Sequence, residues 1–368
     1  MPAMRTIYDL PTPALLLDLD VLERNLRRMS DRAADLGVGL RPHLKTHKCV
    51  EIGRAQQALG SSGATVSTLY EARVFADHGF EDLTWAFPLA PARAPDVADL
   101  GRRIRFGVVV DHPAPVDALE EAGAEVRVWI KIDCGYGRVG LPPEADTVVA
   151  LARRISSSTS LRFAGLLSHS GHAYHARSPY DARRIGEQER SVMAEAAEHL
   201  REEGLEVEGV STGSTPTMAH TEVERLDGVT EVRPGNYALY DYTQVALGAC
   251  AASDCAATVL ATVVSSSETR GQAIVDAGAL ALSADRGPAH TRPSFGRLYD
   301  DYERGTLRHN ARMVSLSQEH GIVDRALPHG ERVRILPNHS CLVTACFDAF
   351  YVVDGESVLD SWKIWRGR

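Results

Sequence analysis

The sequence lacks the features that mark several large classes of protein. Its 368 residues include six cysteines but no CxxC pair, so no disulfide framework organises the chain and reduced thiols are expected. No run approaches the roughly 18 apolar residues of a membrane span, and the first twenty residues lack a signal-peptide pattern. A net charge of −9 argues against nucleic acid or an anionic membrane as the main partner. We therefore expect a cytoplasmic location.

What the sequence does contain is a long alternation of strand-like and helix-like segments. Between residue 13 and about residue 213, short β-rich runs alternate with amphipathic helical stretches, which is typical of parallel βα units. If the run PALLLDLD at 13–20 is a lead-in or the first strand, roughly eight strands result, and a (β/α)8 barrel is predicted. An open doubly wound sheet is the alternative, because periodicity alone does not decide closure.

The pattern changes after residue 242. Residues 243–368 form β-branched or alternating runs separated by turns, with one plausible helix, and this pattern predicts a mostly antiparallel β domain. We therefore expect a barrel domain over 13–242 and a C-terminal β domain over 243–368, with residues 1–12 packed against the second domain.

The segment RPHLKTHK at 41–48 places one lysine among histidines. Pro42 excludes a helix interior, and in a strand His43, Lys45 and His47 would share one face. A lysine on the inner face of a barrel is costly to bury unless its pKa is depressed or it is bonded, which is the condition of a Schiff-base lysine. For this segment alone, an ordinary basic surface run is the alternative.

Two later turns predict an anion site. The segment STGSTPT follows a strand late in the series, where barrel enzymes commonly bind a phosphate. Glycine lets the backbone approach an anion, hydroxyls donate, and a following helix turn adds N–H groups; a plain Ser/Thr turn is the alternative. The later turn RPGNY is expected to complete the cradle. The residues concerned are Thr212, Gly213, Ser214, Thr215, Gly235, Asn236 and Tyr237.

Two further strand ends bear chemically useful side chains. The segment DCGYGRVG at 133–140 matches GxGxxG formally, but it falls late in the βα series and no acidic residue closes a second strand at the expected distance, so we reject dinucleotide binding. Arg138 is instead expected to contact an anion, or to pair with Asp133. The segment HSGHAY offers His172 and Tyr174, which are competent for acid–base catalysis.

The C-terminal half contains one candidate metal motif, PNHSC. His339 and Cys341 are two apart on an extended edge, and a nitrogen and sulfur pair suits zinc. Only two protein ligands would leave positions for water or substrate, as a catalytic metal requires.

Taken together, RPHLKTHK, GYGRVG, HSGHAY, STGSTPT, RPGNYALYD, LSQEHG and PNHSC resemble the fold-type III pyridoxal-phosphate enzymes of the D-serine dehydratase and D-threonine aldolase family. Their N-terminal domain is of the alanine racemase type. The resemblance implies that Lys45 is the Schiff-base lysine and that the STGST and GNY turns receive the cofactor phosphate. It further implies that Arg138 and Tyr174 lie beside the pyridoxal. It also implies that His339 and Cys341 bind Zn²⁺ or another divalent cation.

The resemblance also implies a reaction. It predicts a lyase acting on a D-β-hydroxy amino acid, in which Lys45 removes the α proton and the metal stabilises the leaving hydroxyl. In this family the metal-binding pair is His-x-Cys in the zinc-dependent dehydratases and His-x-Asp in several aldolases. The presence of Cys341 therefore favours dehydration of D-serine or D-3-hydroxyaspartate to a keto acid and ammonia. The alternatives are cleavage to glycine and an aldehyde with His172 as base, racemisation, and a non-catalytic cofactor-binding protein. By resemblance we expect a homodimer.

Overall fold

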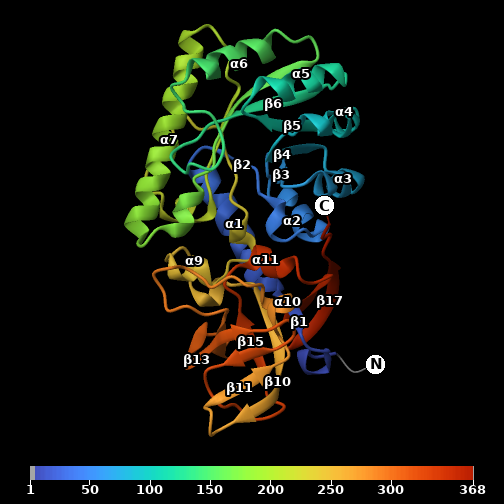
Figure 1. Ribbon diagram of the computed structural model, residues 1–368, viewed down its shortest axis with the longest axis vertical. Helices are drawn as coiled ribbons and strands as arrows, with labels where there is room; N and C mark the ends of the chain where they lie inside the picture. Colours follow the sequence, from blue (N-terminus) through green and yellow to red (C-terminus); the bar gives the residue numbers. More distant parts are fainter. Residues whose placement is uncertain (1–4, 368) are drawn as a thin grey trace.

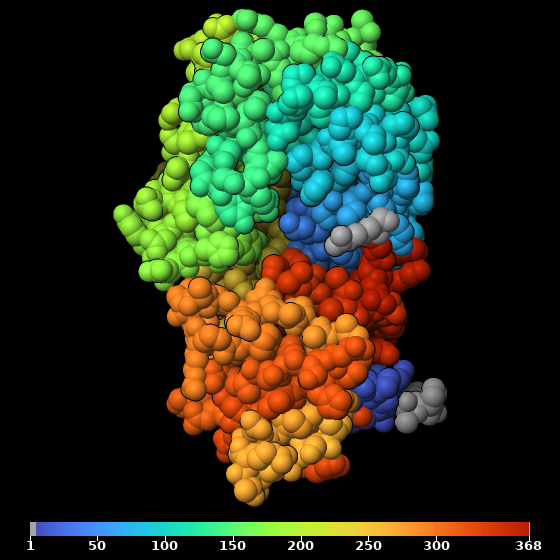
Figure 2. All heavy atoms as spheres, viewed as in Figure 1, coloured from blue at the N-terminus to red at the C-terminus, as the bar shows by residue number. Residues whose placement is uncertain are grey.

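The computed structural model describes residues 5–367 and divides into two parts, an upper α/β part and a lower β part (Figure 1). Helix α11 (Ser340–Thr344) lies where the two parts meet. The sphere view shows the red C-terminal segment lying against the blue start of the barrel (Figure 2). A backbone hydrogen bond from Trp365 N to Lys48 O, 2.8 Å long, fixes this contact.

The upper part is a closed parallel barrel. Its eight strands run in the order β2-β9-β8-β7-β6-β5-β4-β3, and a parallel bridge between His43 and Thr65 joins the first to the last. The predicted (β/α)8 barrel is therefore confirmed and the open sheet is wrong. The strands are β2 (Gly39–Leu40), β3 (Ala64–Val66), β4 (Asp82–Pro88), β5 (Arg105–Val110), β6 (Val126–Lys131), β7 (Leu161–Leu167), β8 (Gly209–Thr212) and β9 (Glu231–Val232).

Helices follow the strands and cover the barrel. In the first of them, the Asp18 side chain caps the N-terminus by accepting from Val21 N at 2.9 Å, and the stripe Leu22, Leu26, Met29 is buried. The helices of this part are α1 (Leu19–Asp35), α2 (Val50–Ala58), α3 (Leu69–Asp77), α4 (Ala94–Gly101), α5 (Pro113–Glu121), α6 (Asp146–Ser156), α7 (Pro179–Glu202) and α8 (Thr215–His220).

The lower part is a mostly antiparallel sheet of nine strands in the order β11-β14-β13-β12-β15-β10-β1-β16-β17. A further pairing of β10 with β11 closes six of these strands into a ring, so the predicted C-terminal β domain is confirmed. Its strands are β10 (Ala257–Ser267), β11 (Gln272–Val275), β12 (Arg297–Asp301), β13 (Thr306–Leu316), β14 (Gly321–Val323), β15 (Arg332–Leu336), β16 (Ala349–Asp354) and β17 (Ser357–Lys363), and its short helices include α9 (Tyr242–Ala246) and α10 (Ala279–Leu282).

Strand β1 (Ala14–Asp18) belongs to this lower sheet and not to the barrel. It pairs antiparallel with β10 and parallel with β16, so the chain begins in the β part and then enters the barrel. The interpretation of this run as the first barrel strand is wrong, because a run buried on both faces suits the interior of either sheet. Thr6 also bridges Ser357 in the β part, whereas residues 1–4 lie outside the described residues.

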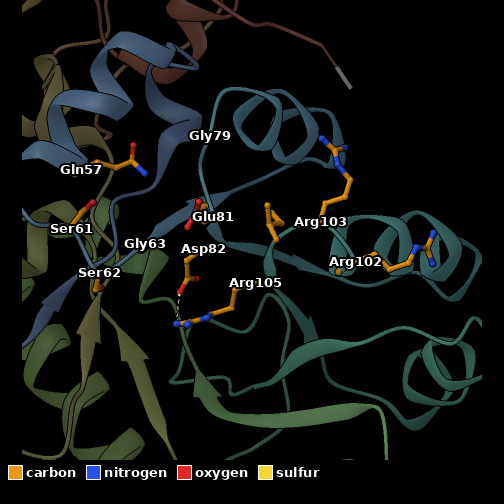
Figure 3. A pocket seen from close by; sticks show the side chains of 12 residues that line it. Gln57, Ser61, Ser62, Gly63, Gly79, Glu81, Asp82, Arg102, Arg103 and Arg105 are labelled. Atoms are coloured by element: carbon orange, nitrogen blue, oxygen red, sulfur yellow. Dashed lines mark hydrogen bonds and ion pairs between the residues drawn. The ribbon is translucent and has the colours of Figure 1, made fainter.

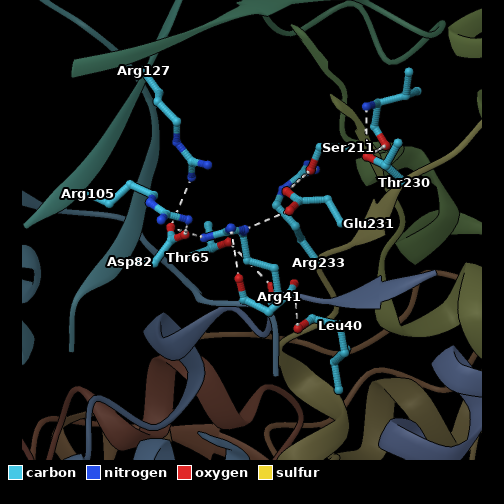
Figure 4. A network of polar contacts seen from close by, with 12 residues as sticks. Leu40, Arg41, Thr65, Asp82, Arg105, Arg127, Ser211, Thr230, Glu231 and Arg233 are labelled. Carbon is cyan, nitrogen blue, oxygen red and sulfur yellow. Dashed lines mark hydrogen bonds and ion pairs between the residues drawn. The ribbon is translucent and has the colours of Figure 1, made fainter. Parts of the chain in front are cut away.

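The interior of the barrel contains a polar network at the N-terminal ends of its strands (Figure 4). The Arg41 guanidinium donates to Glu231 at 2.7 Å and to Asp82 at 2.7 Å, and Arg127 donates to Asp82 at 2.9 Å. Ser211 donates to the other oxygen of Glu231 at 2.5 Å. Ion pairs therefore fill the end of the barrel that lies away from the β part.

No helix within residues 5–367 is both long enough and apolar enough to cross a membrane.

Candidate active site

Lys45 lies in a tight turn directly after β2. Residues Leu44–Thr46 form a 3-10 helix, η2, whose N-terminal His43 side chain accepts from Lys45 N at 3.5 Å. The expectation that His43, Lys45 and His47 share one strand face is wrong, because the strand stops once His43 has paired with Thr65. His47 instead turns into the core, where its Nε2 lies 3.3 Å from Gln56 Oε1.

The Lys45 amine lies in surroundings that favour its neutral form. Burial lowers the pKa of Lys45; the nearby Cys341 raises it, and Arg138 and Arg233 lower it further. A lysine of this kind has a free amine at a lower pH than an exposed lysine, which suits it for nucleophilic or base chemistry. The pKa of His43 is also lowered, by burial first and then by Lys45.

The two turns predicted to bind an anion pack against each other and against the lysine turn. Tyr237 N donates to Thr215 Oγ1 at 3.1 Å. A side chain on Gly235 would lie 2.7 Å from the backbone oxygen of His43, so this close approach requires glycine. The turns therefore meet beside Lys45.

The hydrogen bonds of these turns show which donors an anion would meet. Gly213 N donates to Glu189 at 3.3 Å and Ser214 N donates to Thr217 at 2.9 Å, so neither N–H is free. The buried N–H groups of Gly235 and Asn236 have no acceptor among residues 5–367. Buried donors without a protein acceptor are rare and are satisfied by a water or a ligand, so these two N–H groups are available to an anion.

Tyr174 lies between the STGSTPT turn and the PNHSC metal motif. It belongs to the 3-10 helix η4 (Gly171–His175). Burial raises the pKa of its phenol, and so does the charge on Cys341, whereas hydrogen bonds from Thr215 oppose the shift. The structure therefore brings Tyr174 together with Thr215 and Cys341.

Arg138 and His172 both contact Tyr136. The Arg138 guanidinium lies 4.9 Å from the Tyr136 ring centre, and the His172 ring stacks on Tyr136 with centroids 5.8 Å apart. Asp133 accepts from the backbone N–H groups of its own turn, and within residues 5–367 it forms no ion pair with Arg138. No contact joins His172 to Lys45 or Cys341 in this part of the chain, so His172 stands apart from the other predicted residues.

His339 and Cys341 interact directly. Burial opposes a charge on His339, but the Cys341 thiolate and the Asp285 carboxylate outweigh it and raise the pKa of His339 to about 11. Burial likewise opposes the thiolate, yet His339 and Lys45 lower the pKa of Cys341. Cys341 Sγ lies 3.3 Å from Thr46 Oγ1 in the lysine turn. The pair thus offers a thiolate and an imidazole next to Lys45.

Asp285 orients the His339 ring. Its carboxylate lies 3.3 Å from Nδ1 of His339, which leaves Nε2 for a ligand, and partners of this kind orient metal-binding imidazoles in proteins. No group of three or more His, Cys, Asp or Glu side chains suited to a metal occurs within residues 5–367. A cation at His339 and Cys341 would therefore keep positions open, as a catalytic cation requires.

Sequence reasoning assigned no role to two charged residues around the site, Lys131 and Arg233. Lys131, at the end of β6, is buried, and burial together with Arg233 lowers its pKa to about 7. Arg233 is buried and donates to Ser211 and to the backbone oxygen of Ser168. A lysine inside the apolar run VRVWIKI was the available signal for Lys131. Lys45, Lys131 and Arg233 place three basic side chains around this pocket, with Glu189 near Lys131 and Arg233, and basic side chains suit an anionic cofactor.

Two cavities lie at opposite ends of the barrel. A cavity of about 800 Å³ lies at the N-terminal ends of β3, β4 and β5 and contains none of the predicted site residues (Figure 3). Another, of about 440 Å³, lies between η4 and the loop after α10. Its lining is Tyr174, His175, Arg177, Pro288, Ala289 and His290. The second cavity is therefore the one beside the site.

Comparisons with known proteins cover both parts of the chain. The alanine racemase N-terminal domain model matches residues 17–243, and a serine dehydratase domain model matches residues 256–353. The chain is 39% identical to the D-threo-3-hydroxyaspartate dehydratase of Delftia sp. strain HT23, over 98% of this chain and 99% of that protein. It is 35% identical to the D-serine dehydratase of Dictyostelium discoideum over 97% of both.

Solved structures agree with this result. The Delftia dehydratase superposes with a TM-score of 0.93 at 38% identity, covering 99% of this chain and 100% of that one. A cysteine-to-alanine mutant of that enzyme has been solved in a metal-free form and superposes equally well, with a TM-score of 0.93. An alanine racemase from Clostridium difficile, 13% identical with a TM-score of 0.70, shares the fold. The chain belongs to the D-serine dehydratase and D-threonine aldolase family of fold-type III pyridoxal-phosphate lyases, whose N-terminal domain is of the alanine racemase type.

Proposed function

We propose that this protein eliminates water from a D-amino acid that has a hydroxyl on its β carbon, giving a keto acid and ammonia, with pyridoxal phosphate and a divalent cation. The observation on which this rests is the contact between the lysine turn and the metal motif, Cys341 Sγ to Thr46 Oγ1 at 3.3 Å. This proximity supports a base and a cation ligand acting on one small molecule.

Each predicted residue then has a task. Lys45 would attach the cofactor, the N–H groups of Gly235 and Asn236 and the hydroxyl of Thr215 would bind its phosphate, and His339 and Cys341 would bind the cation, which we propose to be Zn²⁺. When bound, pyridoxal phosphate takes up the electron pair released at Cα and the cation stabilises the leaving hydroxyl. Arg138 and Tyr174 would flank the pyridoxal.

Lys45 itself would move the proton. Because its pKa is lowered by burial, the free amine is available to remove the proton from Cα. Dehydration needs no further base at the β-hydroxyl, whereas cleavage to glycine and an aldehyde does. His172 is the residue predicted for that second role, and its contact with Tyr136 and not with Lys45 supports dehydration over cleavage.

The cavity beside Tyr174 supports an acidic substrate. Its lining contains Arg177 and two histidines but no carboxylate, and a guanidinium suits a second carboxylate. We propose D-3-hydroxyaspartate ahead of D-serine on this ground. Arg177→Met is expected to lower kcat/KM for D-3-hydroxyaspartate by about tenfold or more, the typical effect of losing a charged contact, and to leave D-serine nearly unchanged.

The test is a product analysis. The purified protein is incubated with D-serine, D-threonine and D-3-hydroxyaspartate, with and without Zn²⁺ after chelation. We expect a keto acid and ammonia only when the metal is present, and no yellow colour or activity from Lys45→Ala. Glycine and an aldehyde would identify an aldolase instead, activity that survives chelation would refute the metal role, and no product at all would refute the proposed substrate class.

We also propose a homodimer in the cytoplasm. Two large apolar side chains, Phe87 in β4 and Leu342 in α11, are 59% and 45% exposed, and the centres of subunit interfaces are richer in apolar and aromatic side chains than the rest of a protein surface. The six cysteines are all free thiols, which suits a reducing compartment. Light scattering coupled to gel filtration should give twice the chain mass of 40.0 kDa.

A further inference from the structure

A buried carboxylate, Asp241, joins the two halves of the site. It is 1% exposed. Its Oδ1 accepts from Gln244 N at 3.1 Å and so caps α9. Its Oδ2 accepts from the side-chain amide of Asn236 at 2.6 Å and from Ser340 N at 2.9 Å. One carboxylate therefore bonds to the RPGNY turn (233–237) on one side and to the PNHSC metal motif (337–341) on the other.

Further hydrogen bonds fix the same junction. The Asn236 amide also donates to Ser340 Oγ at 2.9 Å. Tyr242 N donates to Pro337 O at 2.9 Å, and Thr243 Oγ1 donates to Asn338 O at 2.8 Å. Residues 241–243, which follow the RPGNY turn, thus pack directly against residues 337–340.

The two partners of Asp241, Asn236 and Ser340, each belong to a segment predicted to bind an ion. Asn236 supplies a buried N–H group that has no acceptor within residues 5–367, and Ser340 stands between His339 and Cys341. An ion at either place would fix one partner of Asp241 and so favour the arrangement that the other place requires.

We propose that Asp241 is a positioning residue that couples cofactor binding to metal binding, so that each ligand raises the affinity of the protein for the other. This inference rests on the proposed function, because it assumes that pyridoxal phosphate and a divalent cation are the two ligands. Coupling of this kind is reciprocal, so the same factor must appear in both directions.

The test measures binding and not turnover. Protein freed of cofactor with hydroxylamine and of metal with a chelator is titrated with Zn²⁺ against a chromophoric chelator, with and without pyridoxal phosphate. The converse titration follows pyridoxal phosphate by absorbance, with and without Zn²⁺. For the unsubstituted chain we expect about a tenfold gain in each direction. Asp241→Asn should bring both factors to about one, because an amide has a single acceptor oxygen and cannot accept both from Gln244 N and from Asn236 with Ser340.

Asp285→Asn is the matched control. Asp285 contacts His339 at 3.3 Å but forms no hydrogen bond with the RPGNY turn. Asp285→Asn should therefore weaken Zn²⁺ binding equally with and without cofactor, so that the ratio of the two affinities stays the same. Ser340→Ala removes only the hydroxyl contacts and should reduce the coupling factor. It provides the test of the coupling if Asp241→Asn does not fold. A factor of one in the unsubstituted chain, or an unchanged factor in Asp241→Asn and Ser340→Ala, overturns the coupling while the proposed function stands. Failure to bind either ligand overturns both.

Discussion

At the scale of single residues, burial controls the charges near the lysine turn. His47 is fully buried, and its Nδ1 accepts from Cys49 N at 3.1 Å. Burial lowers the pKa of His47 to about 3, against small opposing effects of its hydrogen bonds to Gln56 and Cys49. Burial lowers the pKa of His43 and of His169 in the same direction. The neutral form of these imidazoles is thus part of the folded state.

His47 makes stability depend on pH. Because its pKa is lower in the folded than in the unfolded protein, the unfolded chain binds more protons below about pH 6.5. The free energy of unfolding therefore falls as pH falls from about 6.5 to about 3. His47→Gln should reduce that slope by up to ~1.4 kcal/mol per pH unit, as urea unfolding between pH 7 and pH 4 would reveal. The same change at the exposed His309 should leave the slope as it was; equal slopes for all three proteins would contradict the prediction.

Arg41 stabilises the barrel through two carboxylates. Its side chain is 4% exposed and lies 2.7 Å from both Asp82 and Glu231. Arg41→Ala leaves Glu231 buried without its cation, so we expect a loss of about 3–5 kcal/mol in the free energy of unfolding, measured by chemical denaturation. Arg27 pairs with Glu23 at 2.6 Å on the surface, with side chains 58% and 46% exposed. Arg27→Ala should cost under about 1 kcal/mol, and a cost similar to that of Arg41→Ala would refute the account.

At the scale of elements, β1 decides what can fold separately. It lies between β10 and β16, with Leu17 opposite Ala257. A fragment of residues 256–367 therefore has two open strand edges at the centre of its sheet, and open edges of this kind promote aggregation. The barrel helices begin only at Leu19, so the natural unit of the β part combines both ends of the chain.

A spliced fragment tests this reading of β1. The end of β1 lies beside the start of β10, since Asp18 N donates to Ala256 O at 2.9 Å, so a short turn can join residues 5–18 to residues 256–367. We expect the spliced fragment to unfold cooperatively on heating, followed by circular dichroism, and residues 256–367 alone to lack a transition. If the shorter fragment melts just as cooperatively, β1 is dispensable and the account of the sheet is wrong.

At the scale of the whole molecule, the site forms where the barrel meets the β part. The side chains that line it, Lys45, His43, His169, Tyr174, His339 and Cys341, are all partly exposed. Lys45 and Cys341 are 296 positions apart in the sequence, yet Lys45 directly precedes Thr46 and Cys341 contacts the Thr46 hydroxyl. Neither part alone contains both the lysine and the metal motif, so chemistry that needs both requires the complete chain.

The sequence by itself determined the barrel, the β domain and the identity of most candidate residues. Strand and helix periods are local properties, and a lysine after a strand, a glycine-containing turn and an HxC pair can each be recognised within a few residues. What only the tertiary structure decided is how segments far apart in the sequence pack together. The sheet that β1 joins, the turn that replaces a strand at Lys45, the separation of His172 from Lys45 and the place of Asp241 between Asn236 and Ser340 depend on contacts between distant segments. Such contacts follow from the burial of the whole chain, which no local pattern contains.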